Sequence, residues 1–117
     1  MAQFNRKYPR IPISGLAIIK FLDSASQITG TIEEISRRGI GIYTKEKVIK
    51  GSRVNIKIFC DLGNGPLDYS LSGIVRTEDK QKEFGSIGFE FEKELNSIDH
   101  SDLYNYLISR EKNVDYK

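Results

Sequence analysis

The sequence contains very little of the side-chain chemistry on which metal centres and nucleophilic catalysis depend. Its 117 residues include one cysteine, Cys60, and one histidine, His100. A single cysteine excludes a disulfide within the chain, and one Cys with one His cannot form a zinc cage. The adjacent Glu33 and Glu34 could act as an acid–base pair, but neighbouring side chains of a strand point to opposite faces unless a bulge intervenes. We therefore predict that the protein is not an enzyme.

The two scarce residues have structural interpretations. Cys60 continues the apolar face of a predicted strand, which favours a buried core thiol. His100 stands among acidic and hydroxyl residues at the start of a predicted helix, where we expect a solvated side chain rather than a metal ligand.

Long apolar runs are also missing. The longest, residues 16–19, is far too short to span a bilayer. The charged N-terminal segment, residues 1–10, is not followed by the apolar run of a secretory signal. An unpaired cysteine agrees with a reducing compartment. We therefore expect a cytoplasmic protein without a membrane span.

Neither sign of charge is in large excess. The 18 Lys and Arg residues face 16 Asp and Glu residues, which leaves a net charge of +2. This balance argues against binding of a nucleic-acid polymer by bulk electrostatics. The charges are unevenly placed, however, because residues 1–22 contain no acid and the charges within residues 90–102 are acidic apart from Lys93. Any anion site must therefore be local.

Alternation of apolar and polar residues dominates the rest of the chain. The chain has 38% hydrophobic and 29% charged residues, which is typical of one globular domain. The period of two predicts half-buried strands, and turn residues separate them. The predicted strands are 17–21, 28–35, 39–43, 54–60, 67–75 and 85–91, and the last three form two successive hairpins.

Only the C-terminal segment has a helical period. Leu103, Tyr106 and Leu107 recur at spacings of three and four, and Asn96 offers a cap with an acid three residues further on. We expect a helix over 97–110. Six short strands and one helix predict a mainly β fold, a small six-stranded antiparallel barrel, because closure removes exposed strand edges. The helix should pack on the barrel or plug one end.

Two arginines near the N-terminus are the first candidate binding groups. Arg6 and Arg10 flank Tyr8 and Pro9, and the proline keeps this segment extended and stiff. A guanidinium grips a phosphate bidentately and also stacks on or hydrogen-bonds a guanine edge. The alternatives are a solvated basic tail, or pairing of an arginine with the acidic C-terminal region.

The second candidate is the turn between the second and third predicted strands. Glu34 and Ser36 offer a carboxylate and a hydroxyl, and Gly39 gives a flexible backbone corner, so this turn could read a base edge. Arg37 and Arg38 could add positive potential, although such arginines are commonly just solvated. The alternative is an ordinary turn in which Ser36 satisfies backbone groups and Gly39 supplies a positive φ.

Together these features resemble the PilZ domain, a family of bacterial receptors for the second messenger cyclic di-GMP. The resemblance covers nearly the whole chain. It rests on an RxxxR arm (Arg6, Arg10), a [D/N]xSxxG-like turn (Glu34, Ser36, Gly39), a GF pair (Gly88, Phe89) and the closing helix. It implies a six-stranded barrel whose N-terminal arm folds over a dinucleotide on the outer surface, with residues 1–12 as the flexible arm and 13–117 as the barrel with its helix.

The resemblance also implies a ligand site. Arg6 and Arg10 would contact the phosphates and guanines, while Ser36 and Gly39 would meet a guanine and a phosphate from the other side. Glu34, Arg38 and Gly88 complete the predicted cyclic di-GMP site. No metal and no cofactor besides this ligand are expected.

The sequence departs from the family pattern in two places. Glu34 stands where the family has Asp or Asn, so its carboxylate lies one methylene further from the backbone. A misplacement on that scale costs a hydrogen bond of about 1 to 3 kcal/mol. Asn5 stands where many members carry a further arginine, which leaves the ligand stoichiometry open.

The leading hypothesis is a cyclic di-GMP effector whose arm closes over the ligand and transmits the signal to a protein partner. The alternative is a PilZ-like adaptor that binds no nucleotide and acts through protein contacts. A third interpretation, a barrel for single-stranded nucleic acid, needs aromatic and basic residues on one strand face. Most Phe and Tyr residues fall on the presumed inner faces, so we expect no nucleic-acid polymer as a partner.

Overall fold

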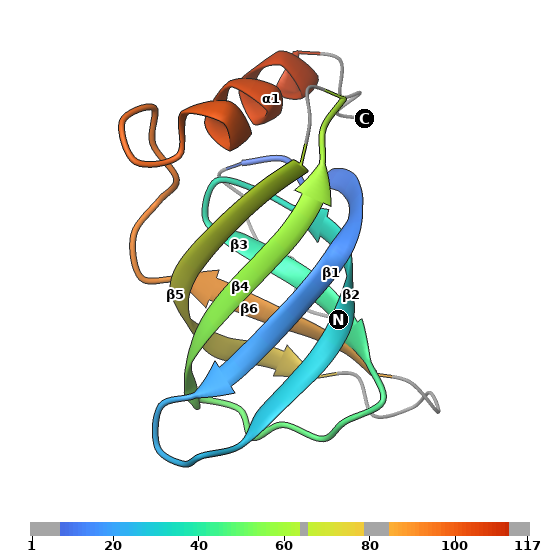
Figure 1. Cartoon of the computed structure of the whole chain (residues 1–117), viewed down its shortest axis with the longest axis vertical. Helices are drawn as coiled ribbons and strands as arrows, with labels where there is room; N and C mark the ends of the chain where they lie inside the picture. Colours follow the sequence, from blue (N-terminus) through green and yellow to red (C-terminus); the bar gives the residue numbers. More distant parts are fainter. Residues whose placement is uncertain (1–7, 64–65, 79–84, 113–117) are drawn as a thin grey trace.

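The computed structural model describes residues 8–63, 66–78 and 85–112. Six strands and one helix follow one another along the chain (Figure 1). They are β1 (Ile11–Phe21), β2 (Gln27–Ile35), β3 (Gly39–Thr44), β4 (Arg53–Asp61), β5 (Pro66–Glu78), β6 (Gly85–Phe91) and α1 (Ser101–Glu111). The mainly β prediction is confirmed, and β1 begins at Ile11, well before the strand expected from the alternation alone.

The strands form a closed barrel in the order β1-β2-β3-β6-β5-β4, and every neighbouring pair is antiparallel. Pairing of β1 with β4 closes it. Both predicted hairpins, β4 with β5 and β5 with β6, are present. Closure gives each strand a partner on both sides, which satisfies backbone groups that short strands would otherwise expose.

Apolar side chains of alternate strand residues fill the barrel. Together with Leu95 and two leucines of α1, these strand residues form the core, whose largest fully buried side chains are Ile19, Ile35, Ile42, Ile56, Ile58, Ile87, Leu95, Leu103, Leu107, Val54 and Val75. Cys60 is buried as expected, and burial with the nearby Asp61 charge raises the pKa of its thiol. A raised pKa keeps the thiol protonated at neutral pH and therefore unreactive.

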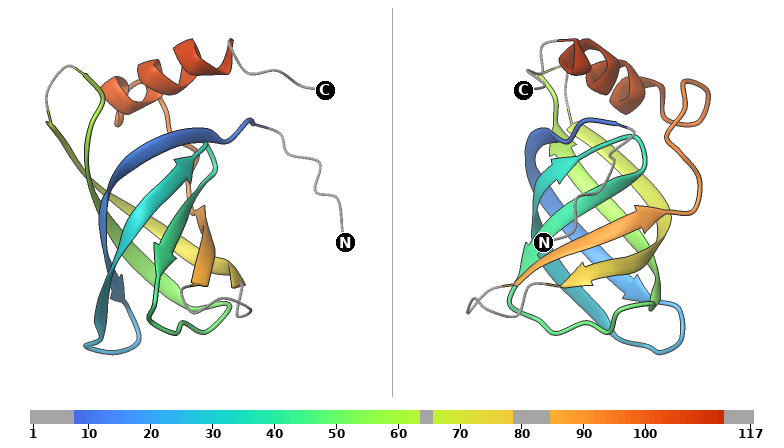
Figure 2. Two further views of the ribbon diagram at one scale, coloured as in Figure 1. Left: turned by 90° about the vertical axis from the view of Figure 1, so that its right-hand side faces the viewer. Right: turned by 180° about the vertical axis from the view of Figure 1, so that it is seen from behind.

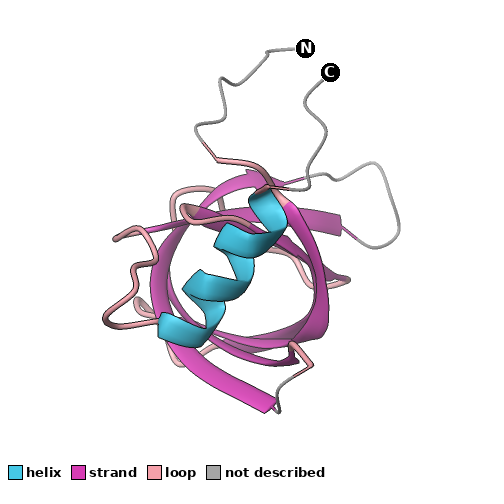
Figure 3. Ribbon diagram, turned by 90° about the horizontal axis from the view of Figure 1, so that it is seen from above, coloured by secondary structure: helices cyan, strands magenta, loops and turns pink. Residues whose placement is uncertain are grey.

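The helix α1 lies across one end of the barrel (Figures 2 and 3). Leu103 and Leu107, four residues apart on one helix face, are fully buried. The expectation that the helix packs on one end is confirmed. Among the described residues no helix is long and apolar enough to cross a membrane.

The predicted start of the helix is wrong by one turn. The Asn96 side chain accepts hydrogen bonds from the backbone N–H groups of Ile98 (2.9 Å) and Asp99 (2.8 Å) and so stabilises a separate turn. α1 then begins at Ser101, with His100 as its N-cap residue. The His100 ring meets Tyr69 edge-on at 5.6 Å between centroids, so this histidine is half-buried instead of fully solvated.

Candidate functional site

Strand register brings the two candidate segments together. Ile11 at the start of β1 pairs with Ile35 at the end of β2, and Ile35 pairs with Ile40 near the start of β3. Arg10, just before β1, and the Ser36–Gly39 turn, between β2 and β3, therefore lie at neighbouring strand ends. The start of β1 and the β2–β3 connection are at the end of the barrel nearer α1 (Figure 2).

An ion pair joins the arm to the turn. Arg10 Nη1 lies 2.9 Å from Glu34 Oε2, and the two side chains are 47% and 34% exposed. The guanidinium thus stays accessible to solvent while Glu34 holds it beside the turn. Arg6, the other predicted arm arginine, lies outside the described residues.

Ser36 organises the turn through its hydroxyl. Ser36 Oγ accepts hydrogen bonds from the backbone N–H groups of Arg38 and Gly39, each at 3.2 Å. The Ser36 N–H donates to the Gly39 carbonyl at 2.8 Å. The interpretation that Ser36 satisfies backbone groups of the turn is confirmed, and the two amides are held in fixed directions.

Gly39 is required for space and not for its φ. Among the described residues, the glycines with positive φ are Gly51 and Gly63, so the alternative interpretation, in which Gly39 supplies a positive φ, is wrong on this point. A Cβ on Gly39 would lie 2.5 Å from the backbone oxygen of Phe89 on β6. The close approach of β3 and β6 therefore excludes any larger residue at this corner.

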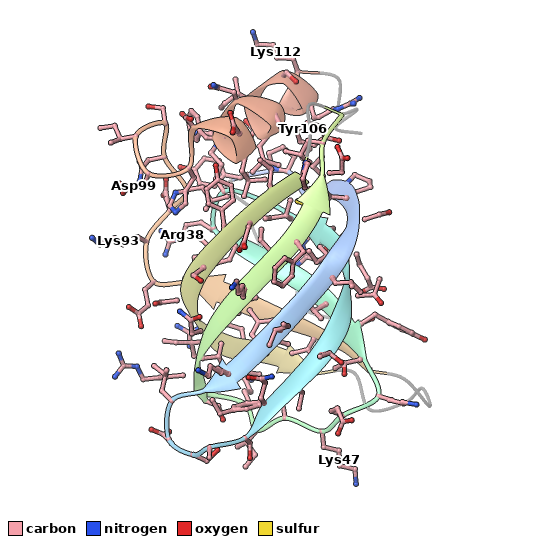
Figure 4. All side chains as sticks on the ribbon, viewed as in Figure 1. Arg38, Lys47, Lys93, Asp99, Tyr106 and Lys112 are labelled. Atoms are coloured by element: carbon pink, nitrogen blue, oxygen red, sulfur yellow. The ribbon has the colours of Figure 1, made fainter. Side chains whose placement is uncertain are left out.

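Arg38 already has anionic partners. Its guanidinium lies 2.9 Å from Glu90 and 3.5 Å from Glu94. The hydrogen bonds with Arg38 and Arg76 lower the pKa of the Glu90 carboxyl, and the hydrogen bond with Glu90 raises the pKa of Arg38. Figure 4 places Arg38 in the half of the barrel nearer α1 and Lys47 at the opposite end.

Arg37 makes contacts that the sequence did not predict. It donates two hydrogen bonds to Glu111 at the end of α1, at 2.9 and 2.7 Å. Its guanidinium carbon also lies 4.2 Å from the centre of the Tyr8 ring. The Arg37 side chain is only 24% exposed, so it is a structural connector and not a solvated arginine. In the sequence, only the presence of Glu111 near the end of the helix and of Tyr8 in the arm pointed to these contacts.

Gly88 lies beside another glycine on the outer wall. Gly41 on β3 pairs with Gly88 on β6, and both alternate with buried neighbours, so both positions face outward. A Cβ on Gly41 would lie 3.2 Å from Glu34 Cγ. Neither glycine adds a side chain of its own to the wall next to the turn, and the stem of Glu34 crosses Gly41.

A bulge changes the geometry of the two adjacent glutamates. The register of β2 against β3 shifts between Ile32 and Glu34. Ile32 and Ile35 are both buried and the two glutamates between them are not, so the expectation of opposite faces is wrong. Glu33 accepts a hydrogen bond from Ser86 Oγ at 3.1 Å, whereas Glu34 turns to Arg10. The two carboxylates consequently serve different partners. In the described part of the chain, no group of three Cys, His, Asp or Glu residues could hold a metal ion.

The fold and site define a small β-barrel with an arginine arm and a serine–glycine turn at one end. The model of the PilZ domain family matches residues 4–109. The chain belongs to the PilZ domain family, as the motifs indicated. A comparison with curated protein sequences gives no match.

Solved structures support the same fold. The Bacillus subtilis inhibitor of motility MotI (DgrA) matches with a TM-score of 0.74 and 19% identity, over 97% of this chain and 55% of MotI. MrkH of K. pneumonia in complex with cyclic di-GMP matches with a TM-score of 0.66 and 15% identity, over 93% of this chain and 52% of MrkH. The PilZ domain of YcgR from Escherichia coli with cyclic di-GMP matches with a TM-score of 0.58 and 17% identity, over 94% of this chain and 93% of that domain. This chain thus spans about half the length of the MotI and MrkH chains.

Proposed function

We propose that this chain is a receptor for cyclic di-GMP whose binding site is the barrel end formed by the arm and the Ser36–Gly39 turn. The observation that carries the proposal is the place of Arg10, whose side chain is 47% exposed and which precedes β1 beside the Ser36–Gly39 turn. MrkH and the PilZ domain of YcgR, which share the fold, are both described in complex with cyclic di-GMP.

The proposed roles follow from the chemistry of each group. Arg10, together with Arg6, neutralises the two phosphates, because guanidinium binds phosphate bidentately. Ser36 holds the turn amides in place, and Gly39 lets the ligand and β6 approach the backbone closely. Gly88 contributes flat wall against which a base can lie.

Glu34 acts as an internal competitor of the ligand. Its carboxylate pairs with the Arg10 guanidinium, which would otherwise be available to bind a phosphate. Arg38 is similarly held by Glu90 and Glu94 and adds positive potential only after an exchange of partners. Exposed ion pairs of this kind are worth about 0 to 1 kcal/mol, so displacing Glu34 from Arg10 costs the ligand little.

We further propose that ligand binding acts on a protein partner in the cytoplasm of a bacterium and that the chain binds no nucleic-acid polymer. MrkH is described as a transcription regulatory factor, but this chain covers only about half of it. The compact charged site suits a dinucleotide better than a polymer, which needs an extended basic surface.

Titration calorimetry with cyclic di-GMP tests the proposal. We expect saturable heat from the parent protein and at least about tenfold weaker binding by Arg10→Ala, because one charge-assisted phosphate contact is lost. Arg53→Ala is the matched control, since Arg53 is also exposed and paired with a glutamate, Glu92 at 3.3 Å, but lies on β4. No heat from the parent, or equal affinity of Arg10→Ala and the parent, refutes the proposal.

The alternative function is an adaptor that binds no nucleotide. It is favoured by the neutralisation of Arg10 and Arg38 by glutamates in the nucleotide-free protein. The adaptor predicts an amide NMR spectrum unchanged by cyclic di-GMP and a partner recovered equally with and without nucleotide.

A further inference from the structure

Arg37 is the point where three separate parts of the chain meet. It lies in the β2–β3 turn, binds Glu111 of α1 through two hydrogen bonds, and stacks over Tyr8 of the arm. Its backbone carbonyl also accepts a hydrogen bond from the Leu95 N–H at 2.8 Å. One side chain therefore connects the arm, the turn and the end of the helix.

The contacts of Arg37 with Glu111 and Tyr8 reinforce each other, and the guanidinium carbon also lies 5.8 Å from the centre of the Tyr104 ring on α1. A guanidinium donates hydrogen bonds in its plane and stacks through its face, so the Glu111 fork and the Tyr8 ring use different directions. The ring restricts the rotation of the guanidinium, which keeps both donors aimed at the carboxylate. Tyr8 itself is oriented by its hydroxyl, which donates to Glu94 at 2.8 Å.

The position of Tyr8 links this contact to the ligand. Tyr8 lies between the two arm arginines, Arg6 and Arg10, in sequence. A ligand that fixes the guanidinium of Arg10 therefore also restrains Tyr8, two residues earlier in the chain. At the other side of Arg37, Glu111 holds the last turn of the helix whose Leu103 and Leu107 cover the barrel end.

We infer that Arg37 is a positioning residue that couples the N-terminal arm to the last turn of α1 through its contacts with Tyr8 and Glu111. The inference rests on the proposed function only for the identity of the ligand that acts on the arm. Ligand contact with Arg10, two residues after Tyr8, then stabilises the last turn of α1 through these contacts.

Amide hydrogen exchange of residues 108–111 in the nucleotide-free protein tests the coupling. We expect Tyr8→Ala to speed exchange of this last turn about fivefold, the size of one partly exposed cation–π contact. Exchange of the β4 core amides should stay unchanged, which shows that the effect is local.

Tyr8→Ala combined with each of two further substitutions shows whether the coupling passes through Arg37. In Arg37→Met, Tyr8→Ala should cause no further increase in exchange. In Arg110→Met it should still cause the full increase, because Arg110 lies in the same helix, 4.9 Å from the Tyr106 ring. An equal increase in both backgrounds, or no increase in the parent, overturns the inference.

Two conservative variants separate the contacts. Tyr8→Phe keeps the ring but loses the hydrogen bond to Glu94 that orients it, so its protection should lie between those of the parent and Tyr8→Ala. Arg37→Lys keeps the charge without the fork and should retain only part of the protection. Full protection in Arg37→Lys would overturn the role of the fork.

Saturating cyclic di-GMP adds a readout that separates this inference from the proposed function. Nucleotide should slow exchange of residues 108–111 in the parent and leave Arg37→Met unchanged, whereas an equal effect in both refutes transmission through Arg37. If calorimetry detects no binding, the proposed function fails, and the nucleotide-free comparison still decides the coupling.

Discussion

The turn at the candidate site and the turn after β4 use the same local chemistry. In the first, Ser36 Oγ accepts the N–H groups of Arg38 and Gly39. In the second, Asp61 Oδ1 accepts the N–H of Gly63 at 2.8 Å. Both are side-chain-stabilised turns with a glycine, and their sequences look alike in kind.

The surroundings of the two glycines differ. Gly63 has φ +99° and open space where a methyl group would stand, whereas Gly39 lies against the Phe89 oxygen. The site turn is also tied to the end of β6, since the Arg38 carbonyl accepts the Phe91 N–H at 2.7 Å. The site turn is therefore shaped by long-range packing, and the other turn by local backbone conformation.

Alanine and asparagine substitutions at the two glycines test this difference. They should give the largest change in the free energy of unfolding among the predictions. Gly39→Ala should lower the free energy of unfolding by about 3 kcal/mol, because the methyl group overlaps a backbone oxygen in a packed barrel. Gly63→Ala should cost about 1 kcal/mol, the strain of an ordinary residue at positive φ. Urea denaturation measures both.

Asparagine sharpens the comparison because it tolerates positive φ but needs space. Gly63→Asn should be nearly as stable as the parent, whereas Gly39→Asn should be at least as unstable as Gly39→Ala. A Gly39→Asn protein as stable as Gly63→Asn would contradict the packing explanation.

A smaller effect, on ligand affinity, is expected from substitution of Glu34, whose carboxylate lies beside the site turn. Glu34→Gln removes the carboxylate that occupies Arg10 and should strengthen cyclic di-GMP binding about fivefold, as expected from the release of one exposed ion pair. Calorimetry measures the change. Asp68→Asn is the matched control near the other turn, because Asp68 also pairs with an exposed cation, Lys57 at 4.0 Å.

Glu34→Asp separates charge from length. It keeps the charge and shortens the side chain to one found in the family pattern. Tighter binding by Glu34→Asp with no gain in Glu34→Gln would show that length, and not competition for Arg10, sets the affinity.

The barrel itself could be predicted from the sequence. Strand alternation such as that of Val54, Ile56 and Ile58 depends only on which face is buried, and this pattern is local. The hydrogen-bonding role of Ser36 was predicted for the same reason, because it involves residues two and three positions away.

Features that depend on distant residues could not be predicted. The partner of Arg37 is Glu111, 74 positions away, and the neighbour that excludes a side chain at Gly39 is Phe89 on another strand. The helix start was misplaced because Asn96 caps a separate turn, which has the same sequence signature as a helix cap.

The smallest expected effect concerns the acid stability of the site turn. Hydrogen bonds with Arg38 and Arg76 lower the pKa of Glu90 in the folded protein, so Glu90 stabilises the fold above its unfolded pKa. That contribution is lost as pH falls through the lowered folded pKa. Urea denaturation from neutral to acidic pH should therefore give a shallower decline for Glu90→Gln than for the parent. Glu46→Gln, an exposed carboxylate in the β3–β4 loop, should leave the decline unchanged. Equal declines in the parent and Glu90→Gln would mean that the charges around Arg38 do not stabilise this turn.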